Sequence, residues 1–96
     1  MLTWLIYDIA ENKIRTKVAA CCKNAGLYRV QKSVFLGDIE KNRIDELHLQ
    51  CDNLIDKKKD SVYVFPMCKD DFKNVKTSGN AFDKSLVSDE ILSMFF

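Results

Sequence analysis

The chain has 96 residues, of which 47% are hydrophobic and 30% charged, and its net charge is +1; this composition is typical of a single globular domain. Its apolar runs fall far short of the roughly 20 residues that a membrane-spanning helix needs, so no membrane partner is expected. No basic segment precedes an apolar stretch near the N-terminus, and we therefore expect a cytoplasmic protein rather than a secreted one.

The distribution of charge is more informative than its sum. Residues 1–36 carry six Lys or Arg residues against Asp8 and Glu11, whereas the remaining chain is net negative. A basic N-terminal third is compatible with a polyanionic partner such as a nucleic acid. Lysines solvated on the outer faces of helices would give the same count, so charge alone leaves the two interpretations equal.

The chain opens with a predicted strand, Leu2–Asp8, whose apolar side chains alternate between two faces. Because both faces are apolar, both must be covered in the folded protein. A helix is predicted over Glu11–Asn24, since apolar residues recur at helical spacing, and Gly26 suits its C-cap. The apolar stripe of this helix comprises Ile14, Val18, Cys21, Cys22 and Ala25.

Alternation over Leu27–Ile39 predicts two short strands with a break near Lys32. Arg29, Gln31 and Phe35 share one parity and should therefore lie on one face of the sheet. We expect Gln31 and Phe35 to lie at an interface between two chains.

A second helix is predicted over Glu40–Lys58, followed by a strand over Ser61–Met67 that is apolar on both faces. Phe65 in this strand is a further candidate for an interface between chains. A helical turn over Asp70–Val75 and a short strand around residues 76–78 are expected next. The apolar stripe of the second helix comprises Ile44, Leu47, Cys51, Leu54 and Ile55.

The cysteines are predicted to be reduced core residues. The four cysteines form no Cys-x-x-Cys pair, and the single histidine, His48, cannot complete a plausible zinc set. Three of them, Cys21, Cys22 and Cys51, fall where a helix would bury them, and a buried thiol behaves as a small apolar group. His48 is expected to be a packed or surface residue rather than a general base.

The order strand, helix, strand, strand, helix, strand is that of ferredoxin-like α+β domains, and we assign the core to residues 1–78. In this fold two helices cover one face of the sheet and leave the other open. Because the open face is apolar here, we expect a homodimer packed sheet to sheet. The tail, residues 79–96, ends in large apolar side chains, and Phe95 and Phe96 are expected to contact a partner chain.

Asp8 is the candidate functional carboxylate, because a strand ends there and a helix with three cations near its start follows at once. A carboxylate beside cations is suited to binding a divalent metal next to a phosphate backbone. The alternative is that Asp8 caps the turn between strand and helix. Residue chemistry alone favours the capping role.

Three segments closely resemble the CRISPR-associated protein family two, the small partner of the CRISPR spacer-acquisition integrase. They are Tyr7-Asp8-Ile9, Lys13-Ile14-Arg15-Thr16-Lys17-Val18 and the specific block Gly26–Ile39. Val62–Pro66 and the tail from Gly79 to Phe96 are also similar to this family, so the resemblance covers essentially the whole chain.

The resemblance implies a ferredoxin-like homodimer in which an extra C-terminal strand packs across the partner chain. It implies duplex DNA binding, a bridging position between dimers of the integrase subunit, and magnesium-dependent endonuclease activity on single-stranded RNA or double-stranded DNA. It identifies Asp8 as the catalytic, metal-binding carboxylate. The basic residues expected to contact nucleic acid are Lys13, Arg15, Lys17, Arg29 and Lys32.

One carboxylate in each chain offers Mg²⁺ only one protein ligand, which is few for a magnesium site. Two copies of Asp8 that meet across a dimer axis could share one hydrated Mg²⁺ or Mn²⁺ ion. Glu11 and Asp38 are possible supplements, although no pattern in the sequence selects them.

Two other kinds of protein share this architecture. One is a toxin-type endoribonuclease of the virulence-associated protein D kind, and the other is a purely non-enzymatic scaffold or RNA-binding module. The signature of RNA recognition motifs is absent from the sequence, which disfavours that module.

Overall fold

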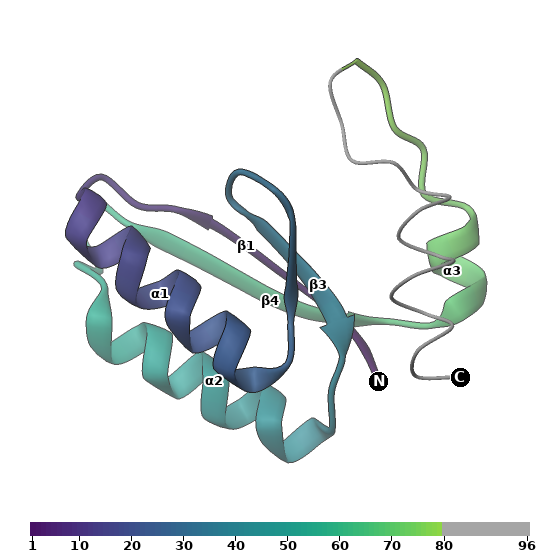
Figure 1. Ribbon diagram of the computed structural model, residues 1–96, viewed down its shortest axis with the longest axis horizontal. Helices are drawn as coiled ribbons and strands as arrows, with labels where there is room; N and C mark the ends of the chain where they lie inside the picture. Colours follow the sequence, from purple (N-terminus) through teal and green to yellow (C-terminus); the bar gives the residue numbers. More distant parts are fainter. Residues whose placement is uncertain (80–96) are drawn as a thin grey trace.

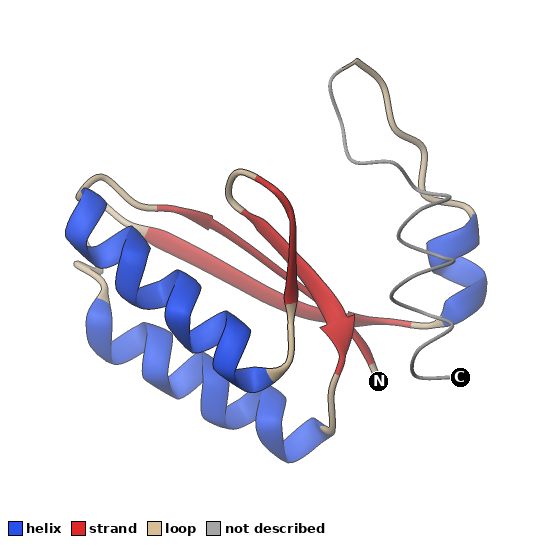
Figure 2. Cartoon of the chain, viewed as in Figure 1, coloured by secondary structure: helices blue, strands red, loops and turns tan. Residues whose placement is uncertain are grey.

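A computed structural model describes residues 1–79 of the chain. One antiparallel sheet has the strand order β2-β3-β1-β4, and helices α1 and α2 lie side by side across one of its faces (Figure 1). A short third helix follows the last strand (Figure 2). The predicted ferredoxin-like α+β fold is confirmed. The elements are β1 (Leu2–Asp8), α1 (Asn12–Ala25), β2 (Tyr28–Gln31), β3 (Val34–Asp38), α2 (Lys41–Leu54), β4 (Ser61–Met67) and α3 (Lys69–Lys73).

Helix α1 begins and ends where its sequence signals predict. Glu11 is the N-cap, and Gly26 adopts the left-handed conformation (φ 104°) at the C-cap. The amide of Gly26 donates to the carbonyls of Cys22 and Lys23, and the amide of Leu27 also donates to that of Cys22, so these carbonyls at the helix end are bonded. A residue with a Cβ would be strained at this φ, which explains the glycine.

The core between the helices and the sheet contains the predicted apolar stripes. Leu5 on β1, Val18 on α1 and Leu47 on α2 are each at most 1% exposed and belong to one cluster. The other members of both stripes lie in this cluster or pack against it. The helical spacing of apolar residues thus correctly identified the helix faces that point to the sheet.

Two cysteines confirm the interpretation as reduced core thiols. Cys22 and Cys51 are fully buried and Cys21 is partly buried, whereas Cys68 is exposed, so the core interpretation is wrong for Cys68. All four thiols are free. Burial raises the pKa of the Cys22 thiol to about 12 and that of Cys51 to about 11. Both thiols therefore stay protonated at neutral pH and act as apolar groups.

The other face of the sheet is covered only in part. Trp4 on β1 stacks on Phe65 at a ring-centroid distance of 6.3 Å, and Phe72 of α3 lies 5.9 Å from Trp4. Leu36 is fully buried in the same cluster. Contrary to the expectation that this face is left open, α3 covers the half of it around Trp4. Tyr63, near the other end of β4, remains 62% exposed.

Phe35 is a core residue, and its predicted place at an interface between chains is wrong. Phe35 is fully buried on the helix side of β3, its ring 6.3 Å from that of Tyr7. The Arg29 guanidinium carbon lies 5.1 Å above the Phe35 ring, close enough for a cation–π contact. Alternation does not tell which apolar face of a strand lies beneath the helices.

Gln31 does not share the face of Phe35, because β2 contains an irregularity. Arg29 pairs with Phe35, whereas Gln31 pairs with Val34, so the register shifts between the two β2 residues. An extra residue of this kind reverses the parity of all that follows. Gln31 therefore lies on the side of the open face, and its interface role stays a prediction.

One predicted helix end and one predicted strand are wrong. Helix α2 ends at Leu54, well before the predicted end at Lys58, because the Asp60 carboxylate accepts a hydrogen bond from the Asp56 amide (3.0 Å) and stabilises a turn there. No strand forms at residues 76–78 in the part of the chain that the structure describes. The helical turn expected near Asp70 is confirmed as α3.

The predicted C-terminal strand, Phe95 and Phe96 lie outside the described residues, so the tail predictions stay predictions. None of the helices within residues 1–79 has the length and apolar character needed to cross a membrane.

Candidate nucleic-acid interface and metal site

The antiparallel topology gathers three connections at one end of the sheet. Asp8, at the end of β1, pairs with Ser61, at the start of β4, and the amide of Tyr7 donates to the carbonyl of Ser33 at 3.1 Å. The β1–α1 loop, the β2–β3 turn and the α2–β4 loop therefore lie together. We call this the Asp8 end of the molecule.

Asp8 is exposed and ends β1. It does not cap α1, because the N-cap is Glu11, so the capping interpretation is wrong. The Asp8 carboxylate has no hydrogen-bond or ion-pair partner among residues 1–79. By strand alternation it lies on the side of Trp4, towards the open face of the sheet. Its carboxylate is thus available to an external ligand.

Residues 1–79 of one chain do not by themselves supply a complete metal site. Residues 1–79 hold no group of three or more His, Cys, Asp or Glu side chains suited to a metal ion. Asp38 cannot supplement Asp8, because it pairs with the N-terminal ammonium at the opposite end of β1, roughly 20 Å away. Glu11 lies closer in sequence, but it pairs with Lys59 at 3.4 Å. Magnesium would find one protein carboxylate here and would need waters or a second chain.

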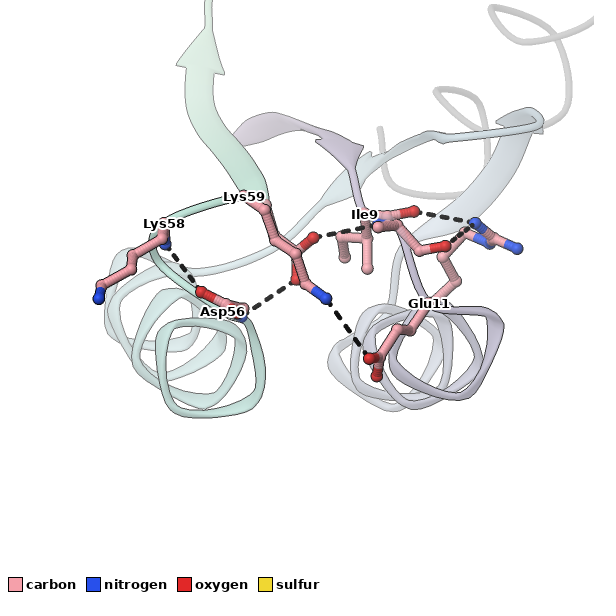
Figure 3. A network of polar contacts seen from close by, with 8 residues as sticks. Ile9, Glu11, Asp56, Lys58 and Lys59 are labelled. Carbon is pink, nitrogen blue, oxygen red and sulfur yellow. Dashed lines mark hydrogen bonds and ion pairs between the residues drawn. The ribbon is translucent and has the colours of Figure 1, made fainter.

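Arg15 holds the loop that follows Asp8. Its guanidinium donates to the carbonyls of Ile9 (2.9 Å) and Ala10 (3.0 Å), and it reaches the Asn12 side chain at 3.4 Å. Figure 3 shows Ile9 of this loop beside Glu11 and the charged residues Asp56, Lys58 and Lys59 of the neighbouring α2–β4 loop. Arg15 was predicted to contact phosphate, and the structure gives it a structural task that the sequence did not reveal.

Asp60 ties the α2–β4 loop to the β1–α1 loop. Its carboxylate accepts hydrogen bonds from the amides of Ala10 and Asp56, each at 3.0 Å. These two bonds to the charged form hold the pKa of Asp60 below its usual value of 3.8. Asp60 and Arg15 together fix the backbone of the residues directly after Asp8.

We predict that Asp60→Asn lowers the melting temperature at pH 7, because Asn offers one acceptor oxygen in place of two and carries no charge. The native carboxylate contributes this stability above pH 4 and loses it as the pH falls through its lowered pKa. The difference between wild type and variant should therefore shrink below pH 4 in thermal melts followed by circular dichroism. Asp45→Asn on the exposed side of α2 is the charge-matched control. A constant difference from pH 7 to pH 3 would contradict this role.

Three predicted nucleic-acid contacts line one cleft. Arg15, Arg29 and Lys32 surround a cavity of about 190 Å³ between the start of α1 and the β2–β3 turn. The cleft also presents polar groups of Asn12, Thr16, Ser33 and Tyr7. Guanidinium, ammonium and hydroxyl donors around one opening are suited to a phosphate group. Because Tyr7 points to the helix side of β1, this cleft and Asp8 lie on opposite sides of the strand.

The other two predicted contacts are separate from the cleft. Lys13 and Lys17 are exposed one turn apart on α1, and the positive end of the helix dipole adds to the charge of Lys13 in the first turn. The sequence interpretation missed Lys57–Lys59, which the topology brings to the Asp8 end. The run was visible in the sequence, but it lay in the part of the chain that is net negative.

Comparison with known proteins decides the family. The model of the family described as CRISPR associated protein Cas2 matches residues 1–75. The chain belongs to the Cas2 family. A relative from Desulforudis audaxviator named CRISPR-associated endoribonuclease Cas2 is 40% identical over 73 residues, which cover 76% of this chain and 69% of the relative. A relative from Halalkalibacterium halodurans named CRISPR-associated endonuclease Cas2 is 36% identical over 70 residues. The match covers 68% of this chain and 72% of the relative.

Solved structures agree with this Cas2 assignment. The crystal structure of Streptococcus pyogenes Cas2 at pH 6.5 superposes with a TM-score of 0.70 at 27% identity, covering 82% of this chain and all (100%) of that one. The crystal structure of a hypothetical protein from Thermus thermophilus, TT1823, superposes with a TM-score of 0.68 at 27% identity. The superposition covers 83% of this chain and 92% of that one. The resemblance seen in the sequence is confirmed, and with it a CRISPR-associated, nuclease-family character.

Proposed function

We propose that the protein is a dimeric subunit of CRISPR spacer acquisition that binds duplex DNA, bridges dimers of the integrase subunit and has a magnesium-dependent endonuclease activity. The observation that carries the proposal is the exposed carboxylate of Asp8, without a partner among residues 1–79, at the end of the molecule where the cations gather. The bridging of integrase dimers rests on membership of the family alone.

The open face of the sheet supports dimerisation beside Asp8. On this face Ile6 pairs with Val34 on one side and with Tyr63 on the other, and α3 covers the opposite half. Ile6 and Val34 are half-buried, and Tyr63 is exposed. A second copy packed on this uncovered half would bury apolar surface and bring two copies of Asp8 towards each other.

The pair of Asp8 carboxylates would hold one Mg²⁺ or Mn²⁺ ion. When bound, such an ion lowers the pKa of a water ligand and polarises a phosphoryl oxygen. Arg15 and Asp60 would keep the loop after Asp8 in place, since their hydrogen bonds fix the backbone at Ile9 and Ala10. Such preorganisation maintains the position of a carboxylate during a reaction.

The nucleic-acid backbone would be held by cations on the helix side of the Asp8 end. Lys13 and Lys17 would contact phosphates from α1, and Arg29 and Lys32 from the cleft at the β2–β3 turn. Contacts of this type position a duplex without reading its sequence. We therefore expect binding that is independent of sequence and steeply dependent on salt.

Charge reversal tests this surface. We predict that the double variant Lys13→Glu/Lys17→Glu weakens binding of a duplex DNA by roughly 10-fold to 100-fold and lowers its salt slope by about two. The measurement is fluorescence anisotropy with a labelled duplex at several salt concentrations. Arg15 is left intact, because its loss would also release the loop after Asp8.

The control is Lys41→Glu/Arg43→Glu, which makes the same change in net charge at the first turn of α2, far from the Asp8 end. Equal losses of affinity in the two double variants would contradict a specific surface on α1.

RNA cleavage is the second candidate, because the relative from Desulforudis audaxviator is named an endoribonuclease. A toxin-type endoribonuclease of the same architecture and a scaffold without catalysis are the remaining alternatives. Parallel assays of single-stranded RNA cleavage, duplex DNA cleavage and spacer integration with the integrase subunit separate them. Integration without cleavage would indicate the scaffold, and RNA cleavage without integration would indicate the toxin-type enzyme.

A further inference from the structure

The α2–β4 loop, residues 56–60, carries a run of exposed cations that the proposed contacts on α1 and in the cleft do not use. Lys57–Lys59 are three consecutive exposed lysines. The pairing of Asp8 with Ser61 brings the loop to the Asp8 end, beside the start of α1. The loop therefore adds positive charge to the end of the molecule where a phosphate backbone is proposed to bind.

Hydrogen bonds fix the shape of this loop. The Asp56 side chain accepts from the amide of Lys58 at 2.9 Å, and the Asp56 carbonyl accepts from the amides of Lys59 (3.2 Å) and Asp60 (2.8 Å). The Asp60 side chain closes the loop through Asp56 and joins it to Ala10. A backbone held in this way loses little conformational freedom when its side chains bind a ligand.

The three lysines differ in their partners. Lys57 lies 3.0 Å from Asp52, and Lys59 lies 3.4 Å from Glu11. The Lys58 ammonium has no ion-pair or hydrogen-bond partner among residues 1–79. In Figure 3 its side chain extends away from the network around Asp56. Lys58 thus combines a fixed backbone with an uncompensated charge.

We propose that this loop is a second phosphate-binding arm, in which Lys58 contacts the backbone of the same nucleic acid that Lys13 and Lys17 bind. The inference rests on the proposed function, because it adds a contact to that partner. Lysine binds phosphate as a point charge and reads no base. The arm therefore extends the bound stretch of backbone without adding sequence preference. The exposed ion pair of Lys59 is weak and can exchange for a phosphate.

The test compares Lys58→Glu with Lys41→Glu in the full chain, using anisotropy with a labelled duplex DNA over a range of salt. Lys41 is an exposed lysine at the other end of α2, roughly 20 Å away, and its substitution changes the charge equally. We expect Lys58→Glu to weaken binding roughly fivefold to tenfold at low salt and to lower the salt slope by about one. Lys41→Glu should change the affinity less than about twofold. Thermal melts establish that both variants fold.

The outcomes separate this inference from the proposed function. A wild-type chain that binds the duplex, together with equal effects of the two substitutions, would overturn the arm and leave the proposed function standing. A wild-type chain that binds no nucleic acid would overturn both. A loss confined to Lys58→Glu, with the lower salt slope, would support the arm.

Discussion

Asp8→Ala is expected to lower magnesium-dependent cleavage of RNA or DNA by at least roughly 100-fold, because the other carboxylates that residues 1–79 bring to this end already have hydrogen-bond or ion-pair partners. They are Glu11, Asp56 and Asp60. The measurement is cleavage of a labelled substrate in magnesium, with EDTA as the blank. Since the exposed Asp8 carboxylate has no hydrogen-bond or ion-pair partner among residues 1–79, the variant should melt close to the wild-type temperature. Loss of activity would then report the metal site rather than the fold.

Glu11→Ala is the matched control, because it removes an exposed carboxylate three positions further along the same loop. Its activity should stay within about threefold of wild type, as the Glu11 ion pair is exposed and weak. Calorimetric titration with Mn²⁺ gives a readout besides activity, with one ion expected for two wild-type chains and none for Asp8→Ala. Equal cleavage by wild type and Asp8→Ala would point to a contaminating nuclease and contradict the site.

Phe35→Ala is expected to lower the free energy of unfolding by about 3–5 kcal/mol, because it removes a fully buried ring and leaves a cavity between Tyr7 and the helices. This is a large part of the roughly 5–15 kcal/mol that stabilises a typical domain. Urea unfolding followed by circular dichroism measures it. The cation–π contact of Arg29 would be lost with the ring.

Leu49→Ala serves as the control, since Leu49 is an apolar residue on α2 that is 61% exposed. Its substitution should change the stability by at most about 0.5 kcal/mol. A Phe35→Ala protein of normal stability that had lost only its dimer would restore the interface interpretation of Phe35.

The sequence predicted the order of the elements from β1 to β4 and the inward faces of the two helices, because both depend on local periodicity. The stripe through Val18 and Leu47 marked the helix faces that are buried, and the break near Lys32 separated β2 from β3. The face assignments of Phe35 and Gln31 failed for two reasons. Alternation cannot tell which apolar face of a strand lies under the helices, and the irregularity in β2 reversed the parity at Gln31.

The candidate site was predicted in part. Asp8 and the five basic residues were identified by residue type and by resemblance, and the structure places three of them, Arg15, Arg29 and Lys32, around one cleft. The clamp formed by Arg15 was not predictable, because its acceptors are backbone carbonyls whose positions depend on the fold. The role of Asp60 in joining the two loops was not predictable for the same reason, since its amide partner at Ala10 is distant in the sequence.

The sequence by itself determined the order of the elements from β1 to β4, the buried thiols of Cys22 and Cys51, and the family, since each is encoded in residue type and spacing along the chain. Only the tertiary structure decided that α3 covers half of the open face and that Lys57–Lys59 lie at the same end as Asp8. The physical reason is antiparallel pairing between distant strands, which fixes the neighbours of a loop through hydrogen bonds that no local pattern contains.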